Sequence, residues 1–293
     1  MDNRAVPAYE TIDVEPLTGT IGAVVGGLDL REPMTDEQAR EVRDALFEHC
    51  VLFFRDQDLT ARQQLDFASR FGPLNLSDFP KPDAAGDDLY IDWLEDTPDR
   101  PPAADLWHTD RTSWAEPPDY AVLNCREVPP SGGDTLWLSL YALYEALSPV
   151  LQEMIDPLRI DVRPSRPSVT DPAPGRRRIA YSADSDKTEG AIHPLVRVHP
   201  ATKRKAVYLC GFSMYGIVGM HDDEAQAIFS LLRKGLYDPN IQCRWRWNPN
   251  DLVIWDERCT NHRATSDHFP NYRLMRRCTA GHGVPLSVSS IGC

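Results

Sequence analysis

The sequence contains no apolar run long enough to cross a bilayer. Residues 1–16 have neither the basic start nor the apolar stretch of a signal peptide, so we expect a cytoplasmic protein. None of the seven cysteines forms a CxxC pair, which argues against a disulfide framework or a cysteine zinc site. We expect reduced, mostly buried thiols.

Basic residues are also in the minority. The 31 Lys and Arg against 44 Asp and Glu give a net charge of -13. An acidic surface repels phosphate backbones, so we expect a small-molecule substrate and neither nucleic acid nor a membrane as partner. The composition is that of a globular protein, and nothing along the chain marks a boundary. We therefore expect a single domain over residues 1–293.

Two capping boxes mark the starts of helices. Thr35 is followed by Gln38 and Thr60 by Gln63, and apolar residues at helical spacing follow both pairs. The second helix is expected to end at Gly72, because glycine commonly terminates helices. Two further helices are expected over residues 140–147 and 222–236.

Most of the remaining apolar segments are short enough to be strands. The expected strands cover residues 51–54, 120–125, 135–138, 195–198, 206–209, 243–247, 252–255 and 273–280. Residues 73–104 predict a long loop with one strand near 89–93. Residues 163–178, rich in proline and arginine, predict an irregular segment within a lid or insertion around 156–192. This pattern favours a mostly β fold with flanking helices, a sandwich or a barrel of the jelly-roll kind.

The segment His108-Thr109-Asp110 is a candidate metal-binding motif. On a strand, residues two apart point the same way, so the imidazole and the carboxylate could share one metal ion. A second histidine would complete a facial triad that leaves three positions open, as non-haem iron(II) requires for a cosubstrate and dioxygen. His262, placed after a strand and a turn, is the candidate, and Arg273 could bind a dicarboxylate cosubstrate bidentately.

A second match to the same motif, His221-Asp222-Asp223, lies where a helix is expected to begin. Asp222 and Asp223 are better explained as N-cap or first-turn acids. We therefore do not expect this segment to bind metal.

Several blocks resemble the taurine dioxygenase and 2,4-dichlorophenoxyacetate dioxygenase family of iron(II)- and 2-oxoglutarate-dependent oxygenases. The resemblance covers nearly the whole chain and depends on the joint order and spacing of the blocks. They are Pro16–Ala23, Phe54–Gln57, Arg70–Gly72, Trp107–Asp110, Gly132–Trp137, His193–Val196, Arg244–Trp247 and His262–Arg277.

The resemblance implies a double-stranded β-helix (jelly-roll, cupin-like) core. We also expect a homo-oligomer, either a dimer or a tetramer. The resemblance further implies that His108, Asp110 and His262 are the catalytic ligands of Fe(II). Arg273 would pair with the far carboxylate of 2-oxoglutarate, and the Thr135 hydroxyl would support the same carboxylate. The expected reaction uses dioxygen to oxidise an unactivated C–H bond, by hydroxylation or else desaturation or cyclisation, with succinate and CO2 as coproducts.

On the substrate side, the resemblance assigns Arg277 to a substrate anion and Phe212 to an aromatic wall. Ser77 and Ala104 stand where taurine-using members have polar contacts, and the Ala104 methyl cannot donate a hydrogen bond. We therefore expect a small or medium anion other than taurine, with natural-product tailoring among the roles considered. Because Arg276 and Arg277 are adjacent on a strand, one of them is expected to face outward.

Two alternatives remain from the residues themselves. A zinc hydrolase could use the same three ligands, but it would have no need of Arg273 and Thr135 as a dicarboxylate clamp. A non-catalytic binding protein on the same fold would tolerate the loss of a ligand, whereas here the triad is intact.

Overall fold

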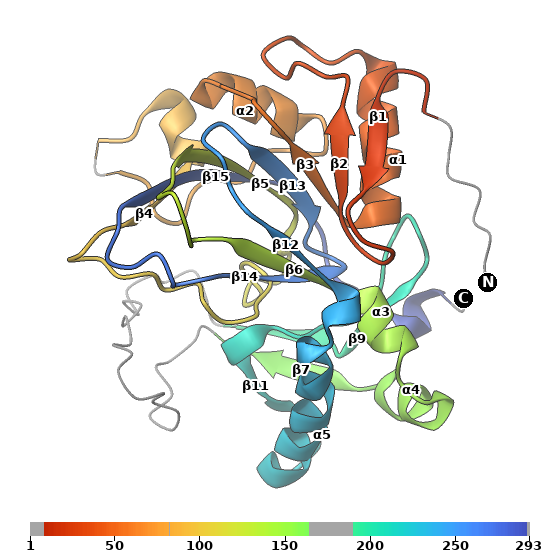
Figure 1. Ribbon diagram of the computed structural model, residues 1–293. Helices are drawn as coiled ribbons and strands as arrows, with labels where there is room; N and C mark the ends of the chain where they lie inside the picture. Colours follow the sequence, from red (N-terminus) through yellow and green to blue (C-terminus); the bar gives the residue numbers. More distant parts are fainter. Residues whose placement is uncertain (1–8, 82, 164–189, 292–293) are drawn as a thin grey trace.

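The computed structural model describes residues 9–81, 83–163 and 190–291, and within them the chain is mostly β (Figure 1). The largest element is a seven-stranded sheet. Its strands, in spatial order, are β1 (Asp13–Pro16), β2 (Ala23–Gly26), β3 (Val51–Phe54), β13 (Leu252–Asp256), β5 (Pro118–Glu127), β15 (Arg273–His282) and β4 (Asp92–Asp96).

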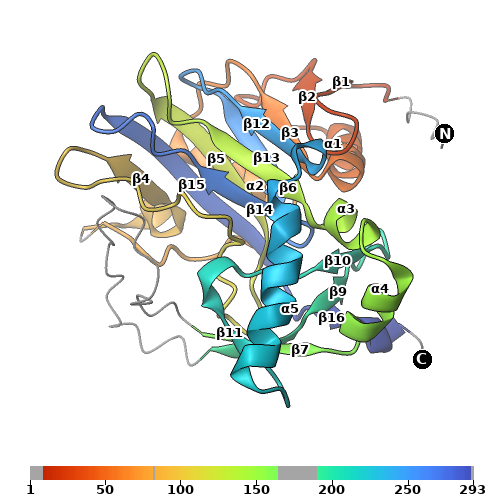
Figure 2. The ribbon, with the colours of Figure 1, turned by 60° about the horizontal axis from the view of Figure 1, so that its bottom comes forward.

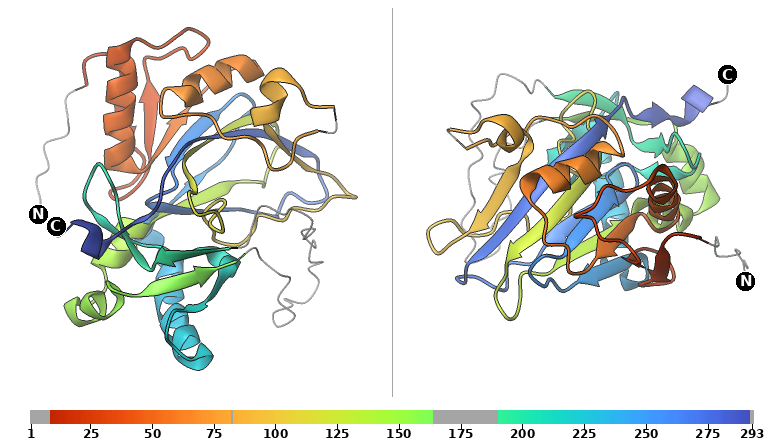
Figure 3. Two further views of the ribbon diagram at one scale, coloured as in Figure 1. Left: turned by 180° about the vertical axis from the view of Figure 1, so that it is seen from behind. Right: turned by 90° about the horizontal axis from the view of Figure 1, so that it is seen from above.

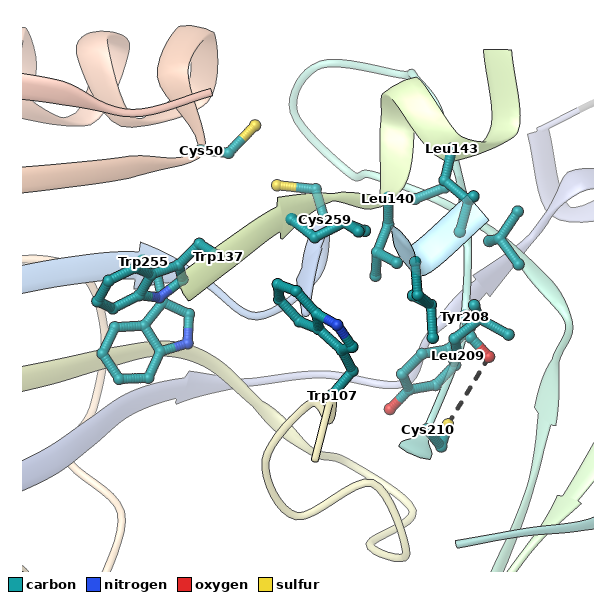
Figure 4. Close-up of a cluster of buried hydrophobic side chains, with 14 of the residues drawn as sticks. Cys50, Trp107, Trp137, Leu140, Leu143, Tyr208, Leu209, Cys210, Trp255 and Cys259 are labelled. Carbon is teal, nitrogen blue, oxygen red and sulfur yellow. Dashed lines mark hydrogen bonds between the residues drawn. The ribbon is translucent and has the colours of Figure 1, made fainter. Parts of the chain in front are cut away.

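A three-stranded sheet packs against one face of this sheet. Its strands, in spatial order, are β12 (Gln242–Trp245), β6 (Thr135–Ser139) and β14 (Thr260–Ala264). Aromatic side chains fill the space between them: Phe53 stacks on Trp245 with ring centroids 4.3 Å apart. Trp137 and Trp255 lie side by side, 5.6 Å apart (Figure 4). Two facing sheets with this core confirm the expected double-stranded β-helix.

Two helices cover the opposite face of the large sheet (Figure 3). They are α1 (Asp36–His49) and α2 (Ala61–Ser69), and both capping boxes are present as predicted. The predicted end of the second helix is wrong, because α2 stops at Ser69. Gly72 instead allows two backbone segments to approach, since a Cβ on it would lie 2.7 Å from the Cα of Gly281.

Two further three-stranded sheets lie beyond the small sheet (Figure 2). One has the order β11 (Met214–Ile217), β7 (Arg159–Val162), β8 (Ala191–Pro194), and the other β10 (Lys205–Val207), β9 (Val196–Val198), β16 (Leu286–Ser287). The helices α3 (Leu140–Glu145) and α5 (Asp222–Lys234) confirm two predictions. α4 (Pro149–Ile155) was not predicted, although Ser148 caps it and Pro149 opens it. The short 3-10 helices are η1 (Gly86–Tyr90), η2 (Gly211–Ser213), η3 (Gly235–Tyr237), η4 (Pro239–Ile241) and η5 (Val288–Ile291).

The strand predicted near residues 89–93 lies slightly later in the chain. Residues 86–90 form η1, and β4 begins at Asp92 because its register is set by pairing with β15. Of the predicted irregular segment 163–178, residues 164–178 lie outside the described residues. The described ends of the expected lid, β7 and β8, pair antiparallel with each other.

The six described cysteines are all buried and free, as expected. Among the described residues, no helix combines the length and the apolar character that a membrane span requires.

Candidate metal centre

His108 and His262 are brought together by the backbone. The amide of each donates to the carbonyl of the other, at 2.9 and 2.8 Å, so both side chains leave the same side of this pair. His262 follows β13 and a turn, as expected, and lies within β14. Of the His108-Thr109-Asp110 segment, His108 is the residue that forms the bridge. The i, i+2 spacing therefore does not act through a regular strand here, because Asp110 follows in a turn.

The three candidate ligand atoms nevertheless converge. Asp110 Oδ1 lies 3.7 Å from His108 Nε2 and 3.8 Å from His262 Nε2. One ligand atom from each of the three residues lies within 4.8 Å of the others. The ring of His108 is oriented by Nδ1, which donates to the Leu106 carbonyl at 2.7 Å and so leaves the Nε2 lone pair facing the site.

The charge states of the buried ligands suit a divalent ion. Burial, together with the neighbouring His108, holds the pKa of His262 well below its ordinary value, so the imidazole is neutral. Burial raises the pKa of Asp110, but the neighbouring Arg277 guanidinium outweighs it and holds this pKa below its usual range. Two imidazole nitrogens and one carboxylate are a donor set that fits iron(II) with open positions.

Glu257 lies directly behind the carboxylate ligand. Its side chain is fully buried and accepts from the Asp110 amide at 3.2 Å and from Trp255 Nε1 at 2.7 Å. Burial first, and the Asp110 charge second, raise the pKa of Glu257 well above its ordinary value. Glu257 therefore fixes the backbone of Asp110.

Arg273 is buried on the face of β15 that looks toward the small sheet. Within the described chain, its hydrogen bond is from Nε to the Gly133 carbonyl at 3.2 Å, and Nη1 lies 3.7 Å from Asp96. Thr135, on β6, accepts a hydrogen bond from Trp247 Nε1 at 3.0 Å. A hydroxyl that accepts in this way still has its own proton to donate.

Arg277 lies on the same face of β15 as Arg273, as predicted, and reaches the ligand Asp110. Its Nη1 donates to Asp110 Oδ2 at 2.6 Å, while Nε and Nη2 donate to Asp92 Oδ2 at 3.2 and 2.9 Å. Burial alone lowers the pKa of Arg277, but Asp110 and Asp92 outweigh it and raise this pKa.

The expectation that Arg276 or Arg277 faces outward is wrong. Arg276 points to the opposite face of the sheet but is only 5% exposed there, because α2 covers it. Its guanidinium donates to Gln64 Oε1, the Leu59 carbonyl and Asn124 Oδ1.

The remaining predicted substrate positions lie around the same site. The Ala104 carbonyl accepts from the Ala264 amide at 2.8 Å, two residues after His262. Phe212 belongs to η2, and its side chain lies outside the described part of the chain. The neighbouring Gly211 packs closely against the segment that holds the first ligand, because a Cβ on Gly211 would lie 2.8 Å from the Trp107 carbonyl oxygen. Ser77 donates through its hydroxyl to Asp92.

The alternative motif is not at this site. His221 is the exposed N-cap of α5, and Asp222 and Asp223 are acids of its first turn, as expected. Sequence reasoning missed Asp92, Glu257 and Arg111 as neighbours of the ligands. Arg111 directly follows a ligand, which was the one available signal.

The comparisons with known proteins agree with this geometry. The family described as "Taurine catabolism dioxygenase TauD, TfdA family" matches residues 13–279. An alkylsulfatase from Acinetobacter baylyi is 32% identical over 92% of this chain and 85% of its own length. An alpha-ketoglutarate-dependent sulfate ester dioxygenase from Pseudomonas putida is 32% identical over 98% of this chain and 96% of its own.

A solved structure is similar over the same extent. A taurine dioxygenase from Burkholderia xenovorans superposes with a TM-score of 0.82 and 30% identity, covering 96% of this chain and 93% of that one. Both the fold and the sequence are therefore shared along almost the whole chain.

Proposed function

The chain belongs to the TauD/TfdA family of alpha-ketoglutarate (2-oxoglutarate)-dependent dioxygenases, and from that premise we propose that it oxidises a C–H bond of a small or medium organic anion. The observation that carries the proposal is Arg277, whose guanidinium contacts the metal ligand Asp110 from inside the fold. A cation fixed there is suited to hold an anionic group beside the reacting centre.

The catalytic chemistry depends on the triad His108, Asp110 and His262, which holds Fe(II) in this family. When bound, iron(II) and 2-oxoglutarate supply the activation of dioxygen and the oxidising power, with succinate and CO2 as coproducts. The chain itself orients the ligands, through Leu106 behind His108 and Glu257 behind Asp110. It also excludes water, since two of the three ligands are buried.

Arg273 and Thr135 are the residues we assign to 2-oxoglutarate. Among the residues that the structure describes, buried Arg273 makes one hydrogen bond and an ion pair as long as 3.7 Å, so most of its N–H donors are available to a carboxylate there. A buried guanidinium with few hydrogen bonds destabilises the fold unless an anion pairs with it, and a dicarboxylate cosubstrate would supply that anion. The Thr135 hydroxyl can donate its proton to the same carboxylate.

Arg277 retains donors for a substrate anion. A guanidinium has five N–H groups, and within the described ranges the three hydrogen bonds to Asp110 and Asp92 leave two of them. The curated relatives named above act on sulfate esters, so alkyl sulfates are the first class we assign. Sulfonates, aryloxy acids and anionic natural-product intermediates share the same head-group chemistry.

The expected outcome is hydroxylation, with desaturation or ring closure as alternatives. A sulfate head group held by Arg277 would bring the carbon next to it toward the metal ligand Asp110, which Arg277 contacts. Hydroxylation there converts R–CH2–OSO3⁻ into R–CH(OH)–OSO3⁻, which collapses to the aldehyde R–CHO and hydrogen sulfate. One dioxygen and one 2-oxoglutarate are consumed, and one succinate and one CO2 are released.

The test begins with anaerobic titration of iron(II) and 2-oxoglutarate while the weak visible charge-transfer band is followed, with His108→Ala as control. Succinate release is then measured in air with hexyl sulfate, hexanesulfonate, phenoxyacetate and neutral 1-hexanol. We expect the band in the wild type only, and faster succinate release with one or more of the anions. If 1-hexanol stimulates succinate release as strongly as each of the anions does, the proposal of an anionic substrate is wrong.

Family membership decides between the alternatives left by the sequence, because it assigns a dioxygenase and not a zinc hydrolase or a non-catalytic protein. The single domain, the cytoplasmic location and the homo-oligomeric state, a dimer or a tetramer, stay predictions.

A further inference from the structure

Arg111 directly follows the ligand Asp110 and has a backbone conformation that arginine rarely adopts. Its φ is +50°, in the left-handed region, where a non-glycine residue costs energy and persists only if its surroundings fix it. His193 supplies part of that constraint, since its buried Nε2 lies 3.0 Å from the carbonyls of both Thr112 and Trp114 and donates to them. The fold thus holds a strained residue next to the metal site.

The Arg111 side chain points inward, toward Arg277. It is 6% exposed, its Nη1 donates to Thr279 Oγ1 at 3.0 Å, and its face lies over the Trp114 ring at 4.8 Å. Its Nη2 is 3.4 Å from Asp92 Oδ2, the oxygen that also accepts from Arg277. Two guanidiniums therefore share one carboxylate oxygen beside the ligand Asp110.

The charges around this pair do not balance inside the protein. Asp110 is taken up by the metal. Among the described residues, Asp92 is then the fully buried anion in contact with both guanidiniums, at 3.4 Å from Arg111 Nη2 and 2.9 Å from Arg277 Nη2. The second counter-charge is Asp78, whose Oδ2 lies 3.0 Å from Arg111 Nε. The Asp78 side chain is 32% exposed, and Arg111 Nε makes no hydrogen bond to the described residues.

We propose that Arg111 and Arg277 together form a paired-guanidinium site for the substrate's anionic head group, and that Asp78 is an internal counter-ion which this group displaces. The inference rests on the proposed function, because it names the residues that recognise its anion. The buried excess is one positive charge, so the site fits a head group with one negative charge, such as a sulfate ester, a sulfonate or a carboxylate. Such a group offers oxygens to both guanidiniums, while Asp78 is solvated at the surface.

Substituting Arg111 and substituting Asp78 should have opposite effects on the affinity for the substrate anion. If Arg111 binds the substrate, Arg111→Gln weakens binding, whereas Asp78→Asn removes a competitor and strengthens it. A purely structural ion pair would behave differently, because breaking it from either side would disturb the same contact and weaken binding in both variants.

The experiment is calorimetric titration of hexyl sulfate into the full chain loaded with iron(II) and 2-oxoglutarate under anaerobic conditions, with 1-hexanol as the neutral comparator. We expect Arg111→Gln to raise the Kd for hexyl sulfate about 10- to 100-fold, the value of a charge-assisted hydrogen bond. Asp78→Asn should lower it about threefold or more. Matched controls are Arg204→Gln, which loses an ion pair with Glu145, and Asp87→Asn, which loses an exposed pair with Arg62.

The outcomes separate the two proposals. If the wild type binds hexyl sulfate no more tightly than 1-hexanol, the anionic substrate class fails and the paired site fails with it. If the wild type prefers the sulfate and Arg277→Gln loses that preference, but Arg111→Gln and Asp78→Asn leave the Kd within about twofold, only the paired site is overturned. If Arg111→Gln does not fold, Asp78→Asn decides alone, because an unchanged or higher Kd would refute displacement.

Discussion

Asp92 and Arg277 occupy paired positions on β4 and β15, and the Nη2 of Arg277 lies 2.9 Å from Asp92 Oδ2. The same guanidinium reaches the ligand Asp110 through Nη1 at 2.6 Å. The edge strand of the large sheet is thereby tied to the metal site by one side chain. Because Asp92 is 1% exposed and also faces Arg111, it is the anion that holds both cations in position.

Removing the Asp92 charge should destabilise the protein strongly. Asp92→Asn leaves two buried guanidiniums without their shared counter-charge, and breaking a buried ion pair from one side costs about 3–5 kcal/mol. We expect a loss of this size in the free energy of unfolding, measured by urea denaturation of the metal-free protein.

The matched control for this variant is Asp87→Asn. Asp87 and Arg62 form a solvent-exposed pair at 3.4 Å, and such pairs contribute about 0–1 kcal/mol. A loss in Asp92→Asn no larger than in Asp87→Asn would show that Asp92 is not the anchor of the two arginines.

The 2-oxoglutarate assignment predicts graded effects on cosubstrate binding. Arg273→Gln removes the cation and should raise the Kd for 2-oxoglutarate about 100-fold, whereas Thr135→Val removes one hydrogen bond and should raise it about 10-fold. Thr135→Ser keeps the hydroxyl and should stay within about threefold of the wild type. The measurement is anaerobic titration at saturating iron(II), and equal losses in the Val and Ser variants would assign Thr135 to packing instead.

The sequence predicts the ligands well because each depends on local chemistry. The histidine and aspartate two residues apart and the distant His262 are the residue types that a facial triad needs. The role of Arg273 toward a dicarboxylate stays a prediction. The helix starts at Thr35 and Thr60 are equally local, since a capping box is made within four residues. These features require no knowledge of which strands become neighbours.

The partners of Arg277 could not be predicted in the same way. Asp92 lies in an acid-rich segment with little periodicity, and only the pairing of β4 with β15 brings it to Arg277. The orientation of Arg276 depends likewise on α2 covering the outer face of the sheet. Alternation along a strand says which residues share a face, but not what covers that face.

Acid should destabilise the metal-free protein partly through His193. Burial, opposed by hydrogen bonds to the Trp114 and Thr112 carbonyls, lowers the pKa of His193 in the folded state. Below about pH 6.5, the ordinary histidine value, the unfolded chain then binds a proton that the folded chain does not, so stability falls as pH falls. We expect the free energy of unfolding to decrease more steeply between pH 7.5 and pH 5.5 in the wild type than in His193→Gln.

This comparison is made by urea denaturation in the presence of a chelator, so that metal binding does not contribute. Part of the slope should persist in the variant, because burial also lowers the pKa of His49 and His262. Identical slopes in the two proteins would mean that His193 is protonated equally in the folded and unfolded states.

The adjacent residues Arg276 and Arg277 should give different results under the same substitution. Arg276 binds Gln64, Leu59 and Asn124 on the helix-covered face, and burial lowers its pKa to about 10. Arg276→Met leaves three buried acceptors without this donor and should cost about 3 kcal/mol or more of stability. The Kd of the folded fraction for hexyl sulfate should stay within about twofold, because the opposite face of the sheet is unchanged.

Arg277→Met removes a cation from the site itself. Its loss should raise the Kd for hexyl sulfate about 10- to 100-fold and also weaken iron(II) binding, since Asp110 Oδ2 loses its 2.6 Å donor. Both variants are expected to lose stability, so the Kd of the folded fraction is the discriminating measurement. A large rise in Kd for Arg276→Met with none for Arg277→Met would mean that the anion binds on the other side of β15, away from the metal ligands.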